Sequence, residues 1–204
     1  ALSDGPVRLR HGDLHAQVAA VAGGLVSWGL QPGDCLLALL TNRWETATLY
    51  WACQMSGIVF TPFNWRATSE EVAFALADSE AKLIVHEHST ELQVAGSAAN
   101  RINVDGAGFE RLLGSRPLAA PVDVAPENTS LMLYTSGTTG RPKGVPRSHA
   151  AELAAGRSAI VHLAYEPGEC QLGAMPLFHT MGIRQLLTSG LLGGHWAAMP
   201  QFDA

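Results

Sequence analysis

The residues best suited to chemistry form a glycine- and hydroxyl-rich stretch that ends in a lysine. Residues 134–144 read YTSGTTGRPKG. Gly137, Gly140 and Gly144 allow positive φ and let the backbone approach a ligand closely, and successive backbone N–H groups in such a turn form a concave anion site. The hydroxyl groups add donors and a ligand for a hard cation, and Lys143 adds a point charge that suits phosphate. These residue types predict a loop that binds a polyphosphate.

The sequence on either side predicts ordered elements that hold this loop. Residues 131–134 form a short apolar run typical of a buried strand. Residues 145–148 can extend again, and a helical pattern begins near His149. Because Pro142 precedes the lysine and a glycine follows it, the stretch is not the Walker loop, which reads G-x-x-x-x-G-K-[ST] and leads directly into a helix. The alternative interpretation is an ordinary surface loop rich in serine, threonine and glycine.

The order of residues 134–144 resembles the signature loop of the adenylate-forming enzymes. This superfamily comprises acyl- and aryl-CoA ligases, adenylation domains of peptide synthetases, and beetle luciferases. In the family the loop holds the phosphates of ATP while a carboxylate attacks the α-phosphate. The resemblance implies ATP, Mg²⁺ and CoA as cofactors, with Thr138 near the metal and Lys143 as a catalytic residue. The implied phosphate-binding residues are Thr135, Ser136, Gly137, Thr138, Thr139, Gly140 and Lys143.

A second motif follows the first, at residues 175–182, which read MPLFHTMG. Its aromatic–histidine pair resembles a family motif at the edge of the acyl pocket. The resemblance implies that His179 orients or gates a carboxylic acid, as a second catalytic residue, and that Phe178, Met181 and Gly182 contact the substrate. The alternative is a histidine whose hydrogen bonds are satisfied at the end of a strand.

Residues 57–66 indicate the branch of the family. They read GIVFTPFNWR and resemble the acyl-CoA ligase version of this segment, whereas peptide synthetase domains usually have an acidic residue where this chain has Asn64. The resemblance favours a ligase that forms acyl-AMP and pyrophosphate and then transfers the acyl group to CoA. An adenylation module that loads a carrier protein and a non-catalytic nucleotide-binding domain remain alternatives. Trp65 and Arg66 are more typical of aromatic–arginine packing than of substrate contact.

Alternating strand and helix patterns predict the fold. The predicted strands are residues 7–10, 34–40, 58–62, 82–85, 101–104, 131–134, 145–148, 171–175 and 195–199. The predicted helices are residues 14–28, 43–55, 69–78, 149–163 and 183–192. This order predicts an α/β fold of mostly parallel sheet layers flanked by helices. Asp13 and Asn42 are the predicted N-caps of the first two helices.

Residues 87–128 have a weaker pattern, and their prolines predict an extended, variable linker within one lobe. The resemblance implies that residues 1–204 are a partial N-terminal AMP-binding domain of a larger ligase. In the family, a glutamate motif for Mg²⁺, an aspartate for the ribose and a separate C-terminal lobe follow. We find no C-terminal lobe in this sequence, so we expect weak nucleotide binding and no turnover from these residues alone.

Composition limits the other function classes. The net charge is −5, and 47% of residues are hydrophobic while 15% are charged, against about 25% charged in an average soluble domain. This balance favours buried parallel strands and argues against a nucleic-acid partner, which requires a basic patch. Cys35, Cys53 and Cys170 are far apart, which predicts free thiols in a reducing compartment. With no signal segment or membrane span, we expect a cytoplasmic protein; a homo-oligomer stays open.

Overall fold

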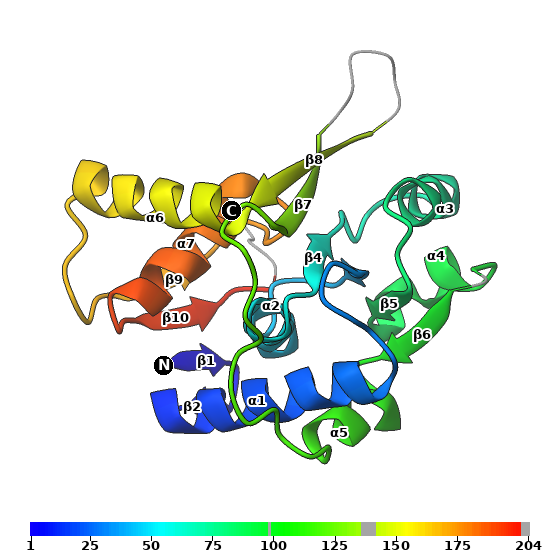
Figure 1. Cartoon of the computed structure of the whole chain (residues 1–204), viewed down its shortest axis with the longest axis horizontal. Helices are drawn as coiled ribbons and strands as arrows, with labels where there is room; N and C mark the ends of the chain where they lie inside the picture. The colour runs from blue at the N-terminus through cyan, green and yellow to red at the C-terminus, as the bar shows by residue number, and fades with distance from the viewer. Residues whose placement is uncertain (98, 136–141, 201–204) are drawn as a thin grey trace.

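The computed structural model describes residues 1–97, 99–135 and 142–200, which form two β-sheets with helices packed against them (Figure 1). One sheet has the strand order β6-β5-β3-β4-β7-β8, and the other has the order β2-β1-β10-β9. The strands of the first sheet are β3 (Cys35–Leu39), β4 (Val59–Pro62), β5 (Leu83–His86), β6 (Asn100–Asn103), β7 (Thr129–Thr135) and β8 (Lys143–Ser148). Those of the second sheet are β1 (Leu2–Asp4), β2 (Val7–Leu9), β9 (Cys170–Gly173) and β10 (His195–Ala198).

Most neighbouring strands are parallel, which confirms the predicted fold class. Strands β3 to β7 run parallel to their neighbours, whereas β8 pairs antiparallel with β7, and β2 pairs antiparallel with β1. Every residue of β3 is buried, as expected for a strand covered on both faces. Its alternate residues face opposite sides, so Leu36 and Ala38 join one apolar cluster while Leu37 and Leu39 join the other.

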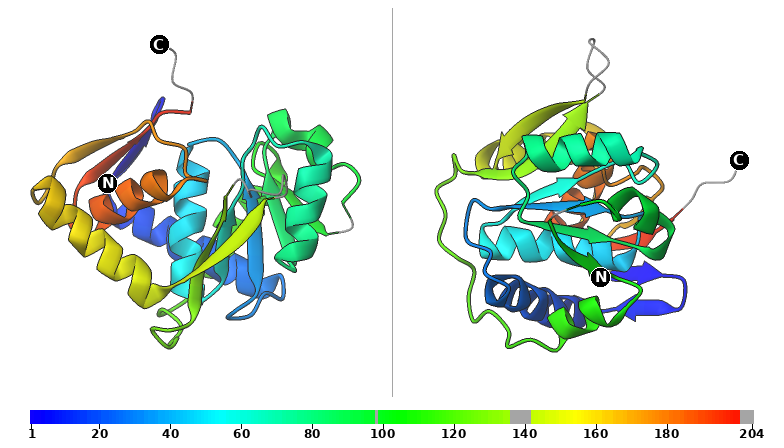
Figure 2. Two further views of the ribbon diagram at one scale, coloured as in Figure 1. Left: turned by 90° about the horizontal axis from the view of Figure 1, so that it is seen from above. Right: turned by 90° about the vertical axis from the view of Figure 1, so that its right-hand side faces the viewer.

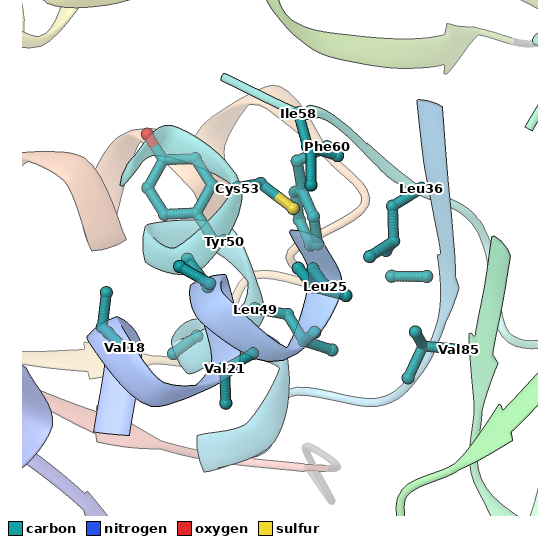
Figure 3. Close-up of a cluster of buried hydrophobic side chains, with 14 of the residues drawn as sticks. Val18, Val21, Leu25, Leu36, Leu49, Tyr50, Cys53, Ile58, Phe60 and Val85 are labelled. Carbon is teal, nitrogen blue, oxygen red and sulfur yellow. The ribbon is translucent and has the colours of Figure 1, made fainter. Parts of the chain in front are cut away.

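Helices cover both faces of the larger sheet (Figure 2). One face carries α1 (His11–Ser27), α2 (Trp44–Ser56) and α5 (Ala107–Leu113), and the other carries α3 (Ser69–Asp78) and α4 (Glu91–Val94), which follows the short 3₁₀ helix η1 (His88–Thr90). Figure 3 shows the larger cluster, in which side chains of α1 and α2 meet those of the sheet. The remaining helices, α6 (His149–Leu163) and α7 (Thr180–Leu191), pack against each other.

Two predicted helix caps are wrong. Helix α1 begins at His11, so Asp13 lies inside its first turn, where the carboxylate accepts a hydrogen bond from the Arg10 backbone N–H at 3.1 Å. Helix α2 begins at Trp44, and Asn42 does not cap it. Its side chain instead bonds a distant segment of the chain, which is described below. Asp13 thus contributes to the start of α1 from the third helical position, whereas Asn42 serves backbone groups far away in the sequence.

The predicted linker contains regular structure that the sequence pattern missed. Helices α4 and α5 lie within residues 87–128, on either side of β6. Phe109 and Leu112 of α5 are buried, and α5 packs against α1. Short helices depend on such tertiary packing rather than on intrinsic propensity, which explains their weak local signal.

The described residues also bear on the state of the cysteines and on membrane-spanning helices. Cys35, Cys53 and Cys170 are free, as predicted, and Cys53 is fully buried. Within the described ranges, no helix combines the length and the apolar character needed to cross a membrane.

Candidate functional site

A cavity of about 380 Å³ lies at the carboxyl ends of β4 and β7. Open α/β sheets bind their ligands at this edge. The walls come from the turn after β4, the start of α3, the end of β7 and the start of α7. The lining residues are Pro62, Phe63, Asn64, Ala67, Glu71, Leu133, Tyr134, Thr135, Pro142, Phe178, His179 and Thr180. The cavity thus brings together parts of both motifs predicted to form the site.

The first motif connects the two strands of a β-hairpin. Strands β7 and β8 pair antiparallel (Figure 1), and Thr135 lies opposite Lys143 in their ladder. Thr135 and Pro142 line the cavity, while Lys143 is exposed at the base of the hairpin. The predicted phosphate-binding residues Ser136, Gly137, Thr138, Thr139 and Gly140 lie outside the described residues.

Tyr134 fixes the base of this hairpin to α3. Its hydroxyl donates a hydrogen bond to Asp78 Oδ2 at 2.8 Å, and its ring packs edge-on against Phe63 with the centroids 5.2 Å apart. Burial, together with the hydrogen bond and negative charge of Asp78, raises the pKa of Tyr134 above its ordinary value. A tyrosine phenol is protonated at neutral pH, so Tyr134 acts as the donor, and the raised pKa extends this state to higher pH.

Gly144 serves this contact rather than the predicted turn. It lies in β8 opposite Tyr134 and does not have a positive φ, so it does not use the conformational freedom that a glycine allows at this position. A Cβ atom at Gly144 would lie 3.1 Å from Asp78 Oδ2 and 3.2 Å from Tyr134 Cζ. The missing side chain therefore makes room for the tyrosine–aspartate pair that anchors the hairpin.

The second motif forms the opposite wall at the start of α7. The rings of Phe178 and His179 lie 4.4 Å apart, and both residues line the cavity beside Thr180. His179 occupies the N-cap position of α7: its backbone N–H donates to Pro176 O at 3.0 Å, and its carbonyl accepts from the Ile183 N–H at 3.2 Å. The imidazole is exposed, and it forms no hydrogen bond with any other described residue. It is thus available to a ligand in the cavity.

Met181 and Gly182 are placed differently. Met181 is 46% exposed, and neither residue is among those that line the cavity. Gly182 is buried, and a Cβ atom there would lie 2.2 Å from Pro176 O. The glycine therefore allows the first turn of α7 to pack directly on the backbone before it. Substrate contact by these two residues stays a prediction.

Comparison with known proteins identifies the family. The family model for AMP-binding enzymes matches residues 1–204, the whole chain. The chain belongs to the AMP-binding enzyme family. This confirms the resemblance to adenylate-forming enzymes drawn from residues 134–144. Feruloyl-CoA synthase from Amycolatopsis sp is 33% identical over 194 residues, which are 95% of this chain and 39% of that protein. The 2-succinylbenzoate–CoA ligase of Bacillus licheniformis is 30% identical over 205 residues, covering 100% of this chain and 42% of that protein.

The fold agrees with solved structures of the AMP-binding enzyme family. The crystal structure of ATP-bound MatB from Rhodopseudomonas palustris matches with a TM-score of 0.90 and 28% identity, over 100% of this chain and 42% of that chain. Because it covers 39% to 42% of these proteins, the chain spans about two fifths of their length.

In this AMP-binding fold, the turn after β4 supplies a wall that sequence reasoning did not assign to the site. Asn64 Oδ1 accepts a hydrogen bond from the Arg66 backbone N–H at 3.0 Å, and Ala67 closes the turn by donating to Asn64 O at 2.9 Å. The Arg66 guanidinium lies over the Trp65 ring at 4.4 Å, which confirms the predicted aromatic–arginine packing. The position of the turn at the end of a buried parallel strand is the signal that could have revealed this wall.

The described part of the site does not by itself form a magnesium site. The predicted metal ligand, Thr138, lies outside the described residues. Among those that are described, no group of three His, Cys, Asp or Glu side chains could hold a metal. Glu71 supplies a carboxylate to the cavity lining, and it already accepts a hydrogen bond from the Thr68 N–H at 2.8 Å. Mg²⁺ usually binds one or two carboxylates together with substrate phosphates, so these described residues alone do not define its site.

Proposed function

We propose that the protein is an AMP-forming acyl- or aryl-CoA ligase. It would activate a carboxylic acid with ATP, giving acyl-AMP and pyrophosphate, and then transfer the acyl group to the thiol of CoA. One observation carries this proposal: the base of the glycine-rich hairpin and the Phe178–His179 pair line the same cavity at the carboxyl edge of the sheet. The names of the two relatives, feruloyl-CoA synthase and 2-succinylbenzoate–CoA ligase, support CoA as the acceptor.

The proposal concerns the whole protein, because the chain spans about two fifths of its relatives' length. We propose that residues 1–204 form part of its N-terminal AMP-binding domain and do not turn over substrate alone. The three free cysteines support a cytoplasmic location.

In the first half-reaction, a carboxylate oxygen of the acid attacks the α-phosphorus of ATP, and the bond to pyrophosphate breaks. The hairpin loop would hold the β- and γ-phosphates through its backbone N–H and hydroxyl groups, with Lys143 at its base offsetting their charge. The acid would lie between this hairpin and the wall of Phe178 and His179. Catalysis by such a site depends on alignment of the reactants and on neutralising charge that develops in the transition state.

Lys143→Ala in the complete protein tests this assignment. Loss of a hydrogen bond to a charged group costs about 1.5–3 kcal/mol, so we expect carboxylate-dependent ATP–pyrophosphate exchange to fall by about 10- to 100-fold. The matched control is Lys82→Ala. Lys82 is also exposed and pairs with Asp34 at 2.7 Å, near the opposite end of the sheet from the cavity. Exchange at the wild-type rate in Lys143→Ala would remove this lysine from the mechanism.

The acceptor is tested separately, by offering the adenylate made by the complete protein either CoA or a phosphopantetheinyl carrier protein. We expect a CoA thioester. Transfer to the carrier alone would assign the protein to the carrier-loading class instead. Absence of pyrophosphate exchange with every acid in a broad panel would indicate a non-catalytic nucleotide-binding domain.

A further inference from the structure

The side chain of Asn42 holds the segment that leads into the Phe178–His179 wall. Asn42 follows β3 and is only 5% exposed. Its Nδ2 donates to Gly173 O at 2.7 Å and to Met175 O at 2.8 Å, and its Oδ1 accepts from the Leu177 N–H at 2.8 Å. Gly173 is the last residue of β9, and Met175 and Leu177 belong to the connection between β9 and α7. One side chain therefore joins the carboxyl end of β3 in the larger sheet to the end of β9 in the smaller sheet.

The amide group is specifically suited to this arrangement. It offers two N–H donors and a carbonyl acceptor in one plane, and the segment presents two carbonyls and one N–H. An ionised aspartate in the same place would accept from the Leu177 N–H but would face the carbonyls of Gly173 and Met175 with negative charge. Alanine would leave all three backbone groups without their partner.

The backbone on both sides of Asn42 is itself anchored. Thr41 donates to Glu87 Oε2 from its backbone N–H at 3.1 Å and from its hydroxyl at 2.9 Å. Arg43 reaches the same carboxylate oxygen at 3.5 Å and pairs with Asp105 at 2.8 Å. Because Glu87 directly follows β5 and is buried, these contacts fix Asn42 relative to the neighbouring strand of the sheet.

The segment that Asn42 holds leads directly into residues that line the cavity. Leu177 is 1% exposed, and Phe178 and His179, which line the cavity, follow it directly. A shift of the backbone at Leu177 therefore displaces both rings. Accurate placement of reacting groups is worth large rate factors, since a misplacement of about 1 Å can cost about 100-fold.

We propose that Asn42 is a positioning residue that determines which carboxylic acids the site accepts, through its hold on residues 173–177. This inference rests on the proposed ligase function. The favoured acid would be one that fills the space between the hairpin and the wall of Phe178 and His179, which Asn42 holds in a fixed place. Asn42 acts only through the backbone of the segment, because it is not among the residues that line the cavity.

The test compares Asn42→Ala and Asn42→Asp with wild type in the complete protein, using pyrophosphate release with a panel of acids of graded size. We expect kcat/KM for the preferred acid to fall by about 10- to 100-fold. The fall should appear largely in the KM for the acid, and the ranking of acids should change. The KM for ATP should stay near its wild-type value, because the hydrogen bonds of the Asn42 side chain to described residues all go to the segment before α7 and none goes to β7 or β8. The aspartate variant retains the acceptor and the size of the side chain, so it serves if the alanine variant does not fold.

Leu112→Ala is the matched control for lost stability. Leu112 is fully buried in α5, against α1, and is not among the cavity-lining residues. It should lower the unfolding temperature while keeping the wild-type ranking of acids. Backbone amide hydrogen exchange should accelerate across residues 173–180 in the Asn42 variants. In the Leu112→Ala control, any acceleration should not be confined to these residues.

The outcomes separate the two proposals. If wild type releases no pyrophosphate with any acid, the proposed function fails and the inference falls with it. If wild type is active but the Asn42 variants keep the wild-type ranking of acids and KM values, Asn42 has only a structural role and the inference alone is overturned.

Discussion

Gly182→Ala tests directly whether the start of α7 is held against a fixed backbone. Gly182 is the third residue of α7. A Cβ atom added there would lie 2.2 Å from Pro176 O and 2.7 Å from Met175 O, closer than the 3.0 Å that real Cβ atoms respect. The obstacle is backbone rather than a flexible side chain, and Asn42 binds the same segment at Met175 and Leu177. The clash therefore has no simple route to relief.

The magnitude follows from two opposing effects. Replacing glycine by alanine inside a helix is worth about 1 kcal/mol of helix propensity, whereas overpacking a well-packed contact costs about 1–3 kcal/mol and sometimes more. Because the blocking atoms are backbone, we expect the upper part of that range and a net loss of about 2 kcal/mol. Gly12→Ala is the matched control, since Gly12 lies in the first turn of α1 with nothing within 4 Å of its added Cβ.

Thermal unfolding followed by circular dichroism measures both variants. For a chain of this size, 1 kcal/mol corresponds to about 2–4 °C. We expect Gly182→Ala to unfold about 4–8 °C below wild type, and Gly12→Ala about 1–4 °C above it. A Gly182→Ala protein that unfolds at or above the wild-type temperature would show that residues 175–176 yield easily. That result would refute the view that the α7 wall is rigid.

Two further predictions concern histidines. His179→Ala in the complete protein should change the relative kcat/KM values across a panel of acids, because the imidazole lines the cavity. His162→Ala, an exposed histidine on α6, is the control, and wild-type kinetics in both variants would refute a pocket role for His179. Burial holds the pKa of His149 below 6.5 in the folded chain. The unfolded chain therefore takes up this proton first, and stability present above pH 6.5 is lost as pH falls through the folded pKa. His149→Gln should thus show a smaller fall in unfolding temperature between about pH 7 and pH 5 than wild type; an equal fall would contradict this.

Local sequence signals predicted two kinds of element: those stabilised by contacts close in sequence, and those that are fully buried. Helix α3 begins at Ser69 as predicted, because Thr68 accepts from the Glu71 N–H at 3.2 Å and the Glu71 carboxylate binds the Thr68 N–H. The capping box and acidic first turn are visible in the sequence. Strand β3 was equally clear, since a continuous apolar run between turn residues indicates a strand buried on both faces.

The errors arise where a residue serves a distant partner. Asn42 was predicted to cap α2, yet its amide bonds Gly173, 131 residues away in sequence. Gly144 was assigned to the ligand-binding loop, but it lies in β8, where its missing side chain accommodates Tyr134 across the hairpin. Neither long-range role can be seen in the local sequence, because an asparagine also suits a helix cap and a glycine also suits a turn. The sequence pattern also did not predict that β7 pairs with β8, because register depends on side chains that face each other only in the folded sheet.

The motifs predicted the residues that line the cavity better than they predicted the residues that hold the lining in place. Thr135, Phe178 and His179 were named from their motifs, and the fold places all three on one cavity. The Asn64 wall was read only as an indicator of the ligase branch. Contacts behind the lining, such as that of Asn42 with Leu177, depend on how two sheets meet and could not be read from either motif alone.

The two walls of the cavity are fixed by different interactions, and this difference bears on specificity. The hairpin wall is joined to α3 by the Tyr134–Asp78 hydrogen bond, in which Asp78 is exposed. Because water can replace either partner of an exposed hydrogen bond, breaking it costs less than leaving a buried polar group unpaired. The α7 wall is held by three hydrogen bonds of a buried amide, and leaving one such buried group unpaired costs about 1–3 kcal/mol. We therefore expect the hairpin wall to adjust at lower cost than the α7 wall, and we expect the choice of acid to depend on the wall of Phe178 and His179.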